Sequence, residues 1–287
     1  MGFSSKDLQP VLYEMLDRIT TGLPNDILSA IKEAHARETK DLAKKQLEAI
    51  LNSSNLSTEE HLPLCQDTGL VTVFVSGDLM GQVREVEEAL TAAIQDLTSK
   101  GGMRANVVNP LTRKNTGTNT GLNQPEVLLD KSNPQTTVRM ILKGAGSENF
   151  TNLKMMVPTA SRQDMLKHIL SVVIEAGGKT CPPNILGIGI GGSAIQAMFN
   201  SKLALLREVG SRNPDPDVAK FENSIVSAAN ELGIGTMGLG GDTTILDAHI
   251  ETAGTHTACL PIAISFGCWA NRVSVAELKD NQFKIVR

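Results

Sequence analysis

The chain has 287 residues, a formal net charge of -4 and only 3% aromatic side chains. Nucleic-acid binding draws on surplus positive charge and on aromatic stacking, so these values argue against an RNA or DNA partner. Residues 1–7 lack the basic start and apolar stretch of a secretory signal, and no apolar run approaches the ~20 residues that span a bilayer. We therefore expect a cytoplasmic protein with no membrane partner.

The first half of the chain combines helical and strand patterns. Apolar residues recur at helical spacing from Leu8 to about Ile50, and the Gly22–Asn25 segment interrupts them, which predicts two helices. A β-branched segment follows the Cys65–Gly69 turn and predicts a strand. The elements expected after that turn are strands at 70–76, 126–129 and 136–142 and a helix from about 83 to 97.

The second half repeats this mixture. The expected elements are helices at 164–176, at 193–206 and from about 214 to 233, and strands at 185–190, 245–250 and 260–266. Strands and helices that alternate irregularly predict an α/β (mixed α+β) fold, with a helical N-terminal segment followed by mixed sheets flanked by helices.

One glycine-rich segment, Gly187–Gly192, fits the G-x-G-x-x-G pattern of dinucleotide-binding enzymes. In that motif the glycines lie in the turn after a strand, but Pro182 and Pro183 leave little room for a strand upstream. The same pattern recurs at Gly233–Gly238. A nicotinamide-dependent oxidoreductase is therefore a rival hypothesis, and we expect these glycines to lie within a strand and to allow close backbone packing.

Three of the four cysteines, Cys65, Cys181 and Cys268, stand in turns marked by glycine or proline. Scattered cysteines are often small buried residues without chemistry, and the absence of a C-x-x-C pair argues against a zinc ribbon or a thioredoxin-like site. Three thiolates on a four-iron cluster would instead leave one iron open to act as a Lewis acid. Asp67, two residues after Cys65, places an acid-base group beside this thiolate.

Further polar segments could bind a carboxylate. The Lys143–Asn149 segment ends a predicted strand in a turn with exposed backbone N–H groups, and Asn115–Gly121 is a second polar, glycine-punctuated loop. Arg104 could hold a carboxylate bidentately. Each of these also fits an ordinary surface role, and none is decisive alone.

Together these strings resemble the iron-sulfur class I fumarate hydratases and the related tartrate dehydratases, in the part that corresponds to the α subunit or N-terminal domain. The resemblance spans nearly the whole chain. It rests on five motifs in order, which are CQDTG at 65–69, NTGTNTG at 115–121, KGAGSEN at 143–149, TCPPNILGIGIGG at 180–192 and SFGCWANR at 265–272.

The resemblance implies a 4Fe-4S cluster held by Cys65, Cys181 and Cys268, with Cys259 outside the ligand motifs and expected to be a core residue. It implies that Asp67 is catalytic, in proton transfer. The substrate contacts that it implies are Gln66, Asp67, Arg104, Gly144, Ser147, Glu148 and Asn149.

The resemblance also implies one α-subunit domain over residues 1–287, with a helical segment at about 1–60, and a separate β subunit in an α2β2 assembly. The reaction implied is the interconversion of fumarate and (S)-malate, because KGAGSEN is close to the fumarase form of that loop, although Ala145 stands where fumarases usually have glycine. A tartrate dehydratase α subunit is the alternative. A noncatalytic iron-sulfur sensor or structural cluster protein is the alternative from another class.

Overall fold

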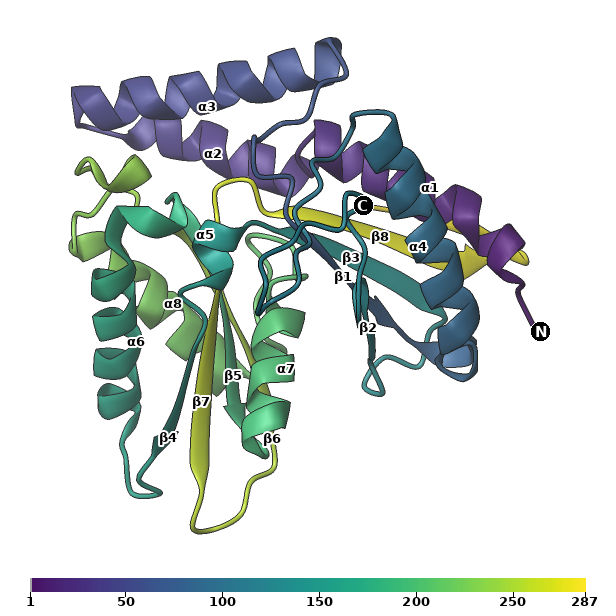
Figure 1. Ribbon diagram of the computed structural model, residues 1–287. Coiled ribbons are helices and arrows are strands. Elements are labelled where there is room, and N and C mark those ends of the chain that lie inside the picture. The colour runs from purple at the N-terminus through teal and green to yellow at the C-terminus, as the bar shows by residue number, and fades with distance from the viewer. Residues whose placement is uncertain (1) are drawn as a thin grey trace. The chain divides into compact units, whose positions relative to one another are not determined.

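The computed structural model describes residues 2–287 and divides into two compact units (Figure 1). Unit 1 contains the chain up to Pro24 together with Ser53–Ala145 and Arg272–Arg287. Unit 2 contains Asn25–Asn52 and Gly146–Asn271. The chain thus passes from unit 1 to unit 2 after Pro24 and again after Ala145, and it returns to unit 1 at Ser53 and at Arg272. That residues 1–287 form one α-subunit domain stays a prediction.

The N-terminal segment is helical, as expected, but it contains three helices instead of two: α1 (Ser5–Thr21), α2 (Asn25–Arg37) and α3 (Asp41–Glu59). The break that was not predicted lies at Glu38–Lys40. Within unit 2, the Glu38 carboxylate accepts hydrogen bonds from the backbone N–H groups of Lys40 (3.0 Å) and Asp242 (3.0 Å), and Thr39 donates to the Asp242 carboxylate. The helix ends here because of a partner about two hundred residues away in the sequence.

Unit 1 is built on a five-stranded sheet. Its strands, in the order β2-β1-β3-β8-β9, are β2 (Glu126–Leu129), β1 (Leu70–Val75), β3 (Thr137–Lys143), β8 (Arg272–Lys279) and β9 (Gln282–Ile285). Strands β1 and β2 are parallel, and the other neighbours are antiparallel. The short 3₁₀ helix η1 (Gly77–Gly81) and helix α4 (Val83–Ser99) follow β1.

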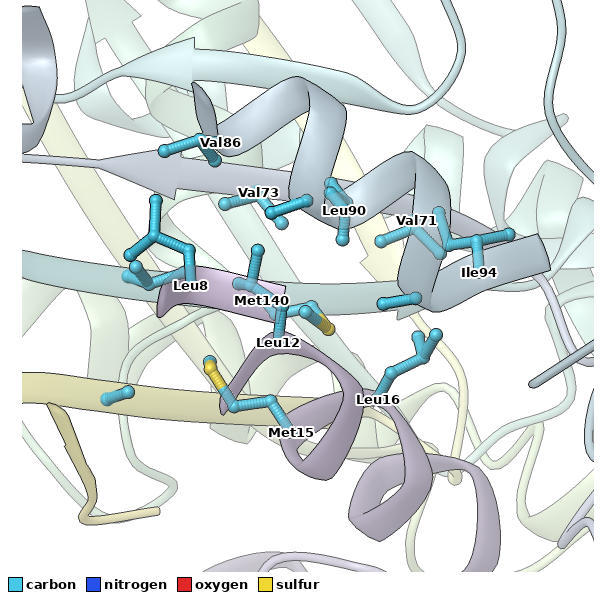
Figure 2. Close-up of a cluster of buried hydrophobic side chains, with 14 of the residues drawn as sticks. Leu8, Leu12, Met15, Leu16, Val71, Val73, Val86, Leu90, Ile94 and Met140 are labelled. Carbon is cyan, nitrogen blue, oxygen red and sulfur yellow. The ribbon is translucent and has the colours of Figure 1, made fainter. Parts of the chain in front are cut away.

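Helices α1 and α4 cover the sheet of unit 1 with apolar side chains (Figure 2). Leu8, Leu12 and Leu16 recur every fourth residue and therefore share one face of α1. Val71 and Val73 alternate along β1 and face the same core. Burial of this core stabilises the sheet. The Cys65–Gly69 turn leads into β1 of this sheet, and the Lys143–Ala145 turn leaves β3 beside it.

Unit 2 has a four-stranded sheet in the order β4-β7-β5-β6. Its strands are β4 (Asn152–Met156), β5 (Asn184–Gly191), β6 (Ile245–Ala253) and β7 (Leu260–Gly267). Strands β5 and β6 are parallel, and β7 is antiparallel to both β4 and β5.

Helices lie on both sides of the unit 2 sheet. These are α6 (Arg162–Ala176), α7 (Ala194–Ala204) and α8 (Pro216–Glu231). The short helix α5 (Ala145–Glu148) and the 3₁₀ turns η2 (Gly177–Thr180) and η3 (Thr236–Gly238) lie in the connections between the larger elements. Helices α6 and α8 pack their apolar residues on one face of the sheet, and α7 lies on the other (Figure 1).

Glycines Gly187 and Gly189 lie inside β5, and this packing role is confirmed. A Cβ at Gly187 would be 2.1 Å from the Ser201 carbonyl oxygen, and one at Gly189 would be 2.0 Å from that of Ala197. Glycine is required because α7 lies directly against the strand. The glycines therefore do not form the phosphate-binding turn that a dinucleotide site needs.

The predicted α/β (mixed α+β) class is confirmed, including the helical N-terminal segment. Strands β4, β8 and β9 were not predicted; β4 and β9 are short and carry little apolar signal, whereas β8 has eight residues with alternating valines that sequence reasoning overlooked. Among the described residues, no helix is both long and apolar enough to cross a membrane.

Candidate active site

The Cys65–Gly69 turn leads into β1 in unit 1. Gly69 has a φ of +83°, and a Cβ there would lie 2.9 Å from the backbone of Lys143. Glycine is the residue that fits both this left-handed conformation and this close approach. The turn therefore lies directly against the end of β3, where the KGAGSEN motif begins. Cys65 is half-buried and Gln66 is exposed.

Asp67 is fixed by both its side chain and its main chain. Its Oδ2 accepts a hydrogen bond from the Ala145 N–H (2.7 Å), and its Oδ1 accepts one from the Gly69 N–H (2.9 Å). Its backbone carbonyl accepts a hydrogen bond from Nη2 of Arg272 (3.0 Å). A Cβ at Gly144 would lie 3.0 Å from Asp67 Oδ2, so the carboxylate rests over this glycine. Two of the predicted segments, CQDTG and KGAGSEN, are thus brought together.

Arg104 belongs to the same side of unit 1. Its guanidinium is exposed, and Nη1 donates to the Gln66 carbonyl (3.3 Å), while its backbone N–H donates to Oγ1 of Thr68 (3.1 Å). The Asn106 side chain donates to the same Thr68 hydroxyl. Its backbone N–H donates to the side-chain oxygen of Asn119 in the NTGTNTG loop. Arg104 is therefore tied to the cysteine turn while its charge faces solvent.

The remaining predicted substrate contacts lie in and just after one short helix. We expected a turn at this position, and the structure instead has helix α5, which Asn149 follows. Ser147 is buried, Asn149 is exposed, and the Glu148 carboxylate pairs with Nζ of Lys202 on α7 (3.0 Å). This ion pair, which sequence reasoning missed, sets the direction of Glu148 within unit 2.

Cys181 and Cys268 lie at the ends of neighbouring strands in unit 2. Cys181 is exposed and precedes β5, while Cys268 is half-buried and follows β7, and the register pairs Ile185 with Gly267. The backbone N–H of Trp269 donates to the Cys181 carbonyl (3.1 Å). The Asn184 side chain donates to the Gly267 carbonyl (3.0 Å). Sheet register and these bonds bring together two residues that are far apart in the sequence.

Cys259 does not belong to this pair. It lies at the other end of β7, where its backbone N–H donates to the His256 carbonyl (2.9 Å) in a turn. It is half-buried, so the expectation of a core residue was wrong for this position.

The donor set suits an iron-sulfur cluster in its chemistry. None of the cysteines within residues 2–287 is in a disulfide, and thiolates are the usual protein ligands of such clusters. Cys65 belongs to unit 1 and the other two to unit 2. In the part of the chain that is described, no group of three His, Cys, Asp or Glu side chains is gathered around a metal position.

A buried guanidinium supports the same fit. Nε and Nη1 of Arg272 have no hydrogen-bond acceptor among the described residues, and this side chain holds the turn that carries Cys65. An unneutralised positive charge behind the turn favours an anionic group such as a thiolate-bound cluster. Arg272 ends the SFGCWANR motif, but sequence reasoning gave it no role.

Unit 1 has a cysteine turn with a rigidly held carboxylate, and unit 2 has two cysteines at neighbouring strand ends. Comparison with known proteins identifies the class of protein to which these features belong. The sequence model of the fumarate hydratase (Fumerase) family matches residues 9–277. The chain therefore belongs to the iron-sulfur fumarate hydratase family.

Two similar relatives are named as tartrate dehydratase subunits. A protein of Methanocaldococcus jannaschii, provisionally named L(+)-tartrate dehydratase subunit alpha, is 39% identical over 282 residues, which are 95% of this chain and 98% of the relative. The L(+)-tartrate dehydratase subunit alpha of Escherichia coli K12 is 31% identical over 268 residues, 92% of this chain and 88% of the relative. The chain is thus similar to α subunits of hydro-lyases.

Proposed function

We propose that this chain is the cluster-bearing α subunit of a two-subunit hydro-lyase that interconverts fumarate and (S)-malate. The proposal rests above all on Asp67, which lies two residues after the candidate ligand Cys65. The Ala145 N–H donates a hydrogen bond to its carboxylate and holds it in place. A carboxylate fixed in this way can exchange a proton with a substrate carbon held beside the cysteine turn.

In this proposal Cys65, Cys181 and Cys268 hold a 4Fe-4S cluster. When it is bound, such a cluster supplies an open iron that acts as a Lewis acid toward the substrate oxygen. Removal of water from malate breaks one C–O bond and one C–H bond, so the enzyme also needs a group that accepts the proton. Asp67 has that role here.

The other predicted substrate residues orient the dicarboxylate. Arg104 offers an exposed guanidinium beside Gln66, and a guanidinium binds a carboxylate in two parallel hydrogen bonds. Gly144 leaves room next to the Asp67 carboxylate because it has no side chain. Ser147, Glu148 and Asn149 would complete the contacts from α5 and the residue that follows it.

The choice of substrate follows from the KGAGSEN loop, whose fumarase-like form favours fumarate and malate. A specific observation favours a second candidate, L(+)-tartrate, since the relatives described above are named for it. Ala145 is relevant to the choice between the two substrates. Its N–H binds Asp67, and its methyl group stands where the glycine usual in fumarases would have a hydrogen.

A separate β subunit, in an α2β2 assembly, is part of the proposal. It is supported by the names of the relatives, each of which is called a subunit alpha. The β subunit would supply the remaining acid-base and cationic groups.

The test is anaerobic reconstitution of the chain with iron and sulfide, followed by Mössbauer or EPR spectra before and after addition of malate, fumarate or L(+)-tartrate. We expect one iron site to be perturbed by malate, and turnover of malate to appear only with a candidate β subunit. Faster turnover of tartrate would replace the first substrate by the second. A cluster whose irons all ignore these acids would indicate the noncatalytic alternative, and full turnover by the chain alone would exclude the need for a β subunit.

A further inference from the structure

Arg272 is one of the largest fully buried side chains, with 1% of its surface exposed. Its Nη2 donates to the Asp67 carbonyl at 3.0 Å, but its Nε and Nη1 have no acceptor within residues 2–287. An arginine stays protonated in proteins, and a buried charge is costly unless it is paired. Arg272 therefore carries a cost that an ordinary structural contact does not explain.

Other shielded arginines of the chain are neutralised by carboxylates. In unit 1, Arg139 on β3 pairs with Asp130. In unit 2, Arg207 pairs with Glu222 at 2.7 Å, and Arg212 with Asp247 at 2.8 Å. The described ion pairs do not include Arg272, although it is more deeply buried than these residues. The difference indicates that the positive charge of Arg272 is kept uncompensated within the chain.

The position of Arg272 directs this charge toward the candidate site. It is the first residue of β8, where it stands opposite Leu142 of β3. The turn that follows β3 supplies the Ala145 N–H that binds the Asp67 carboxylate, and Arg272 binds the Asp67 carbonyl. The end of one strand and the start of its neighbour thus fix the same residue from its side chain and from its main chain.

We propose that Arg272 is a positioning residue of the active site, which holds Asp67 in place and provides a buried positive charge for the anionic cluster. The inference rests on the proposed function, because it assumes that the cluster binds at Cys65. Three thiolates and the inorganic sulfides leave such a cluster anionic. In a medium of low dielectric constant a nearby cation favours its more negative, reduced form and therefore raises its reduction potential.

The experiment compares Arg272→Met, which keeps the length and removes the charge, with Arg272→Lys, which keeps the charge and loses the forked geometry. The reconstituted chains are titrated by EPR, and kcat and KM for malate are measured with the β subunit present. We expect a more negative midpoint potential in Arg272→Met and a potential close to the wild type in Arg272→Lys. We expect kcat to fall about tenfold or more in both variants with a smaller change in KM, since the bond to Asp67 is altered in each.

The double variant Arg139→Met/Asp130→Asn is the matched control, because it removes a neutralised arginine from the same sheet. It should change the stability and leave the potential unchanged. Equal potentials in wild type and Arg272→Met would overturn the inference, as would an equal shift in the control. If Arg272→Met takes up no cluster, the test depends on Arg272→Lys alone. A midpoint potential different from the wild type would then overturn the inference, and an unchanged midpoint potential would support it. Failure of the wild type to bind a cluster would instead reject the proposed function.

Discussion

The two parts of the proposed ligand set are held in different ways. Cys65 lies in a unit 1 turn that is braced by side chains, since Arg272 and Arg104 donate to consecutive carbonyls of residues 66 and 67. Cys181 and Cys268 lie at adjacent strand ends in unit 2, where sheet register and a backbone bond between Trp269 and Cys181 hold them. The first arrangement depends on two arginine side chains, whereas the second depends on the backbone of the sheet together with one side-chain bond from Asn184. Substitutions of these unit 1 side chains should therefore change the catalytic activity more than the stability of the fold.

The largest effect is expected from the cysteines. Replacement of Cys65, Cys181 or Cys268 by alanine should lower the activity by about a thousandfold or more, because the proposed cluster would be lost together with its open iron. Iron content and turnover with the β subunit measure this. Cys259→Ala is the matched control and should keep both. Full activity in any of the three single variants would remove that cysteine from the ligand set.

Asp67→Asn tests the chemistry of the unit 1 turn without removing a ligand. The amide keeps the shape but accepts a proton poorly, so kcat should fall roughly 10²- to 10⁴-fold. The iron content and the shift of the iron site on malate binding should stay near those of the wild type. A variant that retains kcat would show that another group transfers the proton.

Gly69→Ala tests how strictly the unit 1 turn is packed. The positive φ of +83° and the 2.9 Å approach to Lys143 should together destabilise the folded chain by roughly 3 kcal/mol. Gly117→Ala is the control, since Gly117 has a φ of +78° but open space around it, and should cost only about 1 kcal/mol. Urea denaturation measures both, and equal losses would mean that the contact with Lys143 carries no strain.

A pH effect is expected in unit 2. Burial by itself would raise the pKa of Asp247, but the close approach of His249 (Nε2 to Oδ2, 3.2 Å) and hydrogen bonds from the Gly210 N–H and Arg212 outweigh it and lower the pKa to about 2. A folded-state pKa below the ordinary 3.8 stabilises the protein above that pH, and the stabilisation is lost as the pH falls from about 4 to about 2.

The loss should be roughly 2 kcal/mol, which corresponds to the shift in pKa. Denaturation midpoints measured across this pH range test it, with Asp247→Asn as the comparison. The asparagine variant should be less stable near neutral pH and less dependent on pH in the acid range. Equal pH slopes for the two proteins would contradict the assignment to Asp247.

The smallest effect concerns Cys181, which has a φ of +54° although it is not glycine. Because this conformation costs an L-residue about 1 kcal/mol, Cys181→Gly should be more stable than Cys181→Ala by about that amount. Thermal or urea denaturation of the cluster-free chains measures the difference. Greater stability of the alanine variant would show that the local backbone changes once the thiol is removed.

Local patterns in the sequence were enough for much of this fold. Strand β2 and the starts of helix α4 and strands β1, β6 and β7 were predicted from periodicity and turn residues, because those signals are encoded within each segment. The third N-terminal helix was missed because its boundary depends on Asp242, which is distant in the sequence. Helix α5 was missed because a glycine-rich segment has little helical propensity of its own.

By itself the sequence determined the mixed fold class, the family and the residue types available for the chemistry, since each depends on local composition or on ordered motifs. Only the tertiary structure decided that the Asp67 carboxylate lies over Gly144 and that Cys181 is next to the end of β7, which Cys268 follows. It also decided that Arg272 is buried without a carboxylate partner. These facts come from strand register and from hydrogen bonds between residues far apart in the chain. No local pattern encodes them, because they exist only after the sheets have formed.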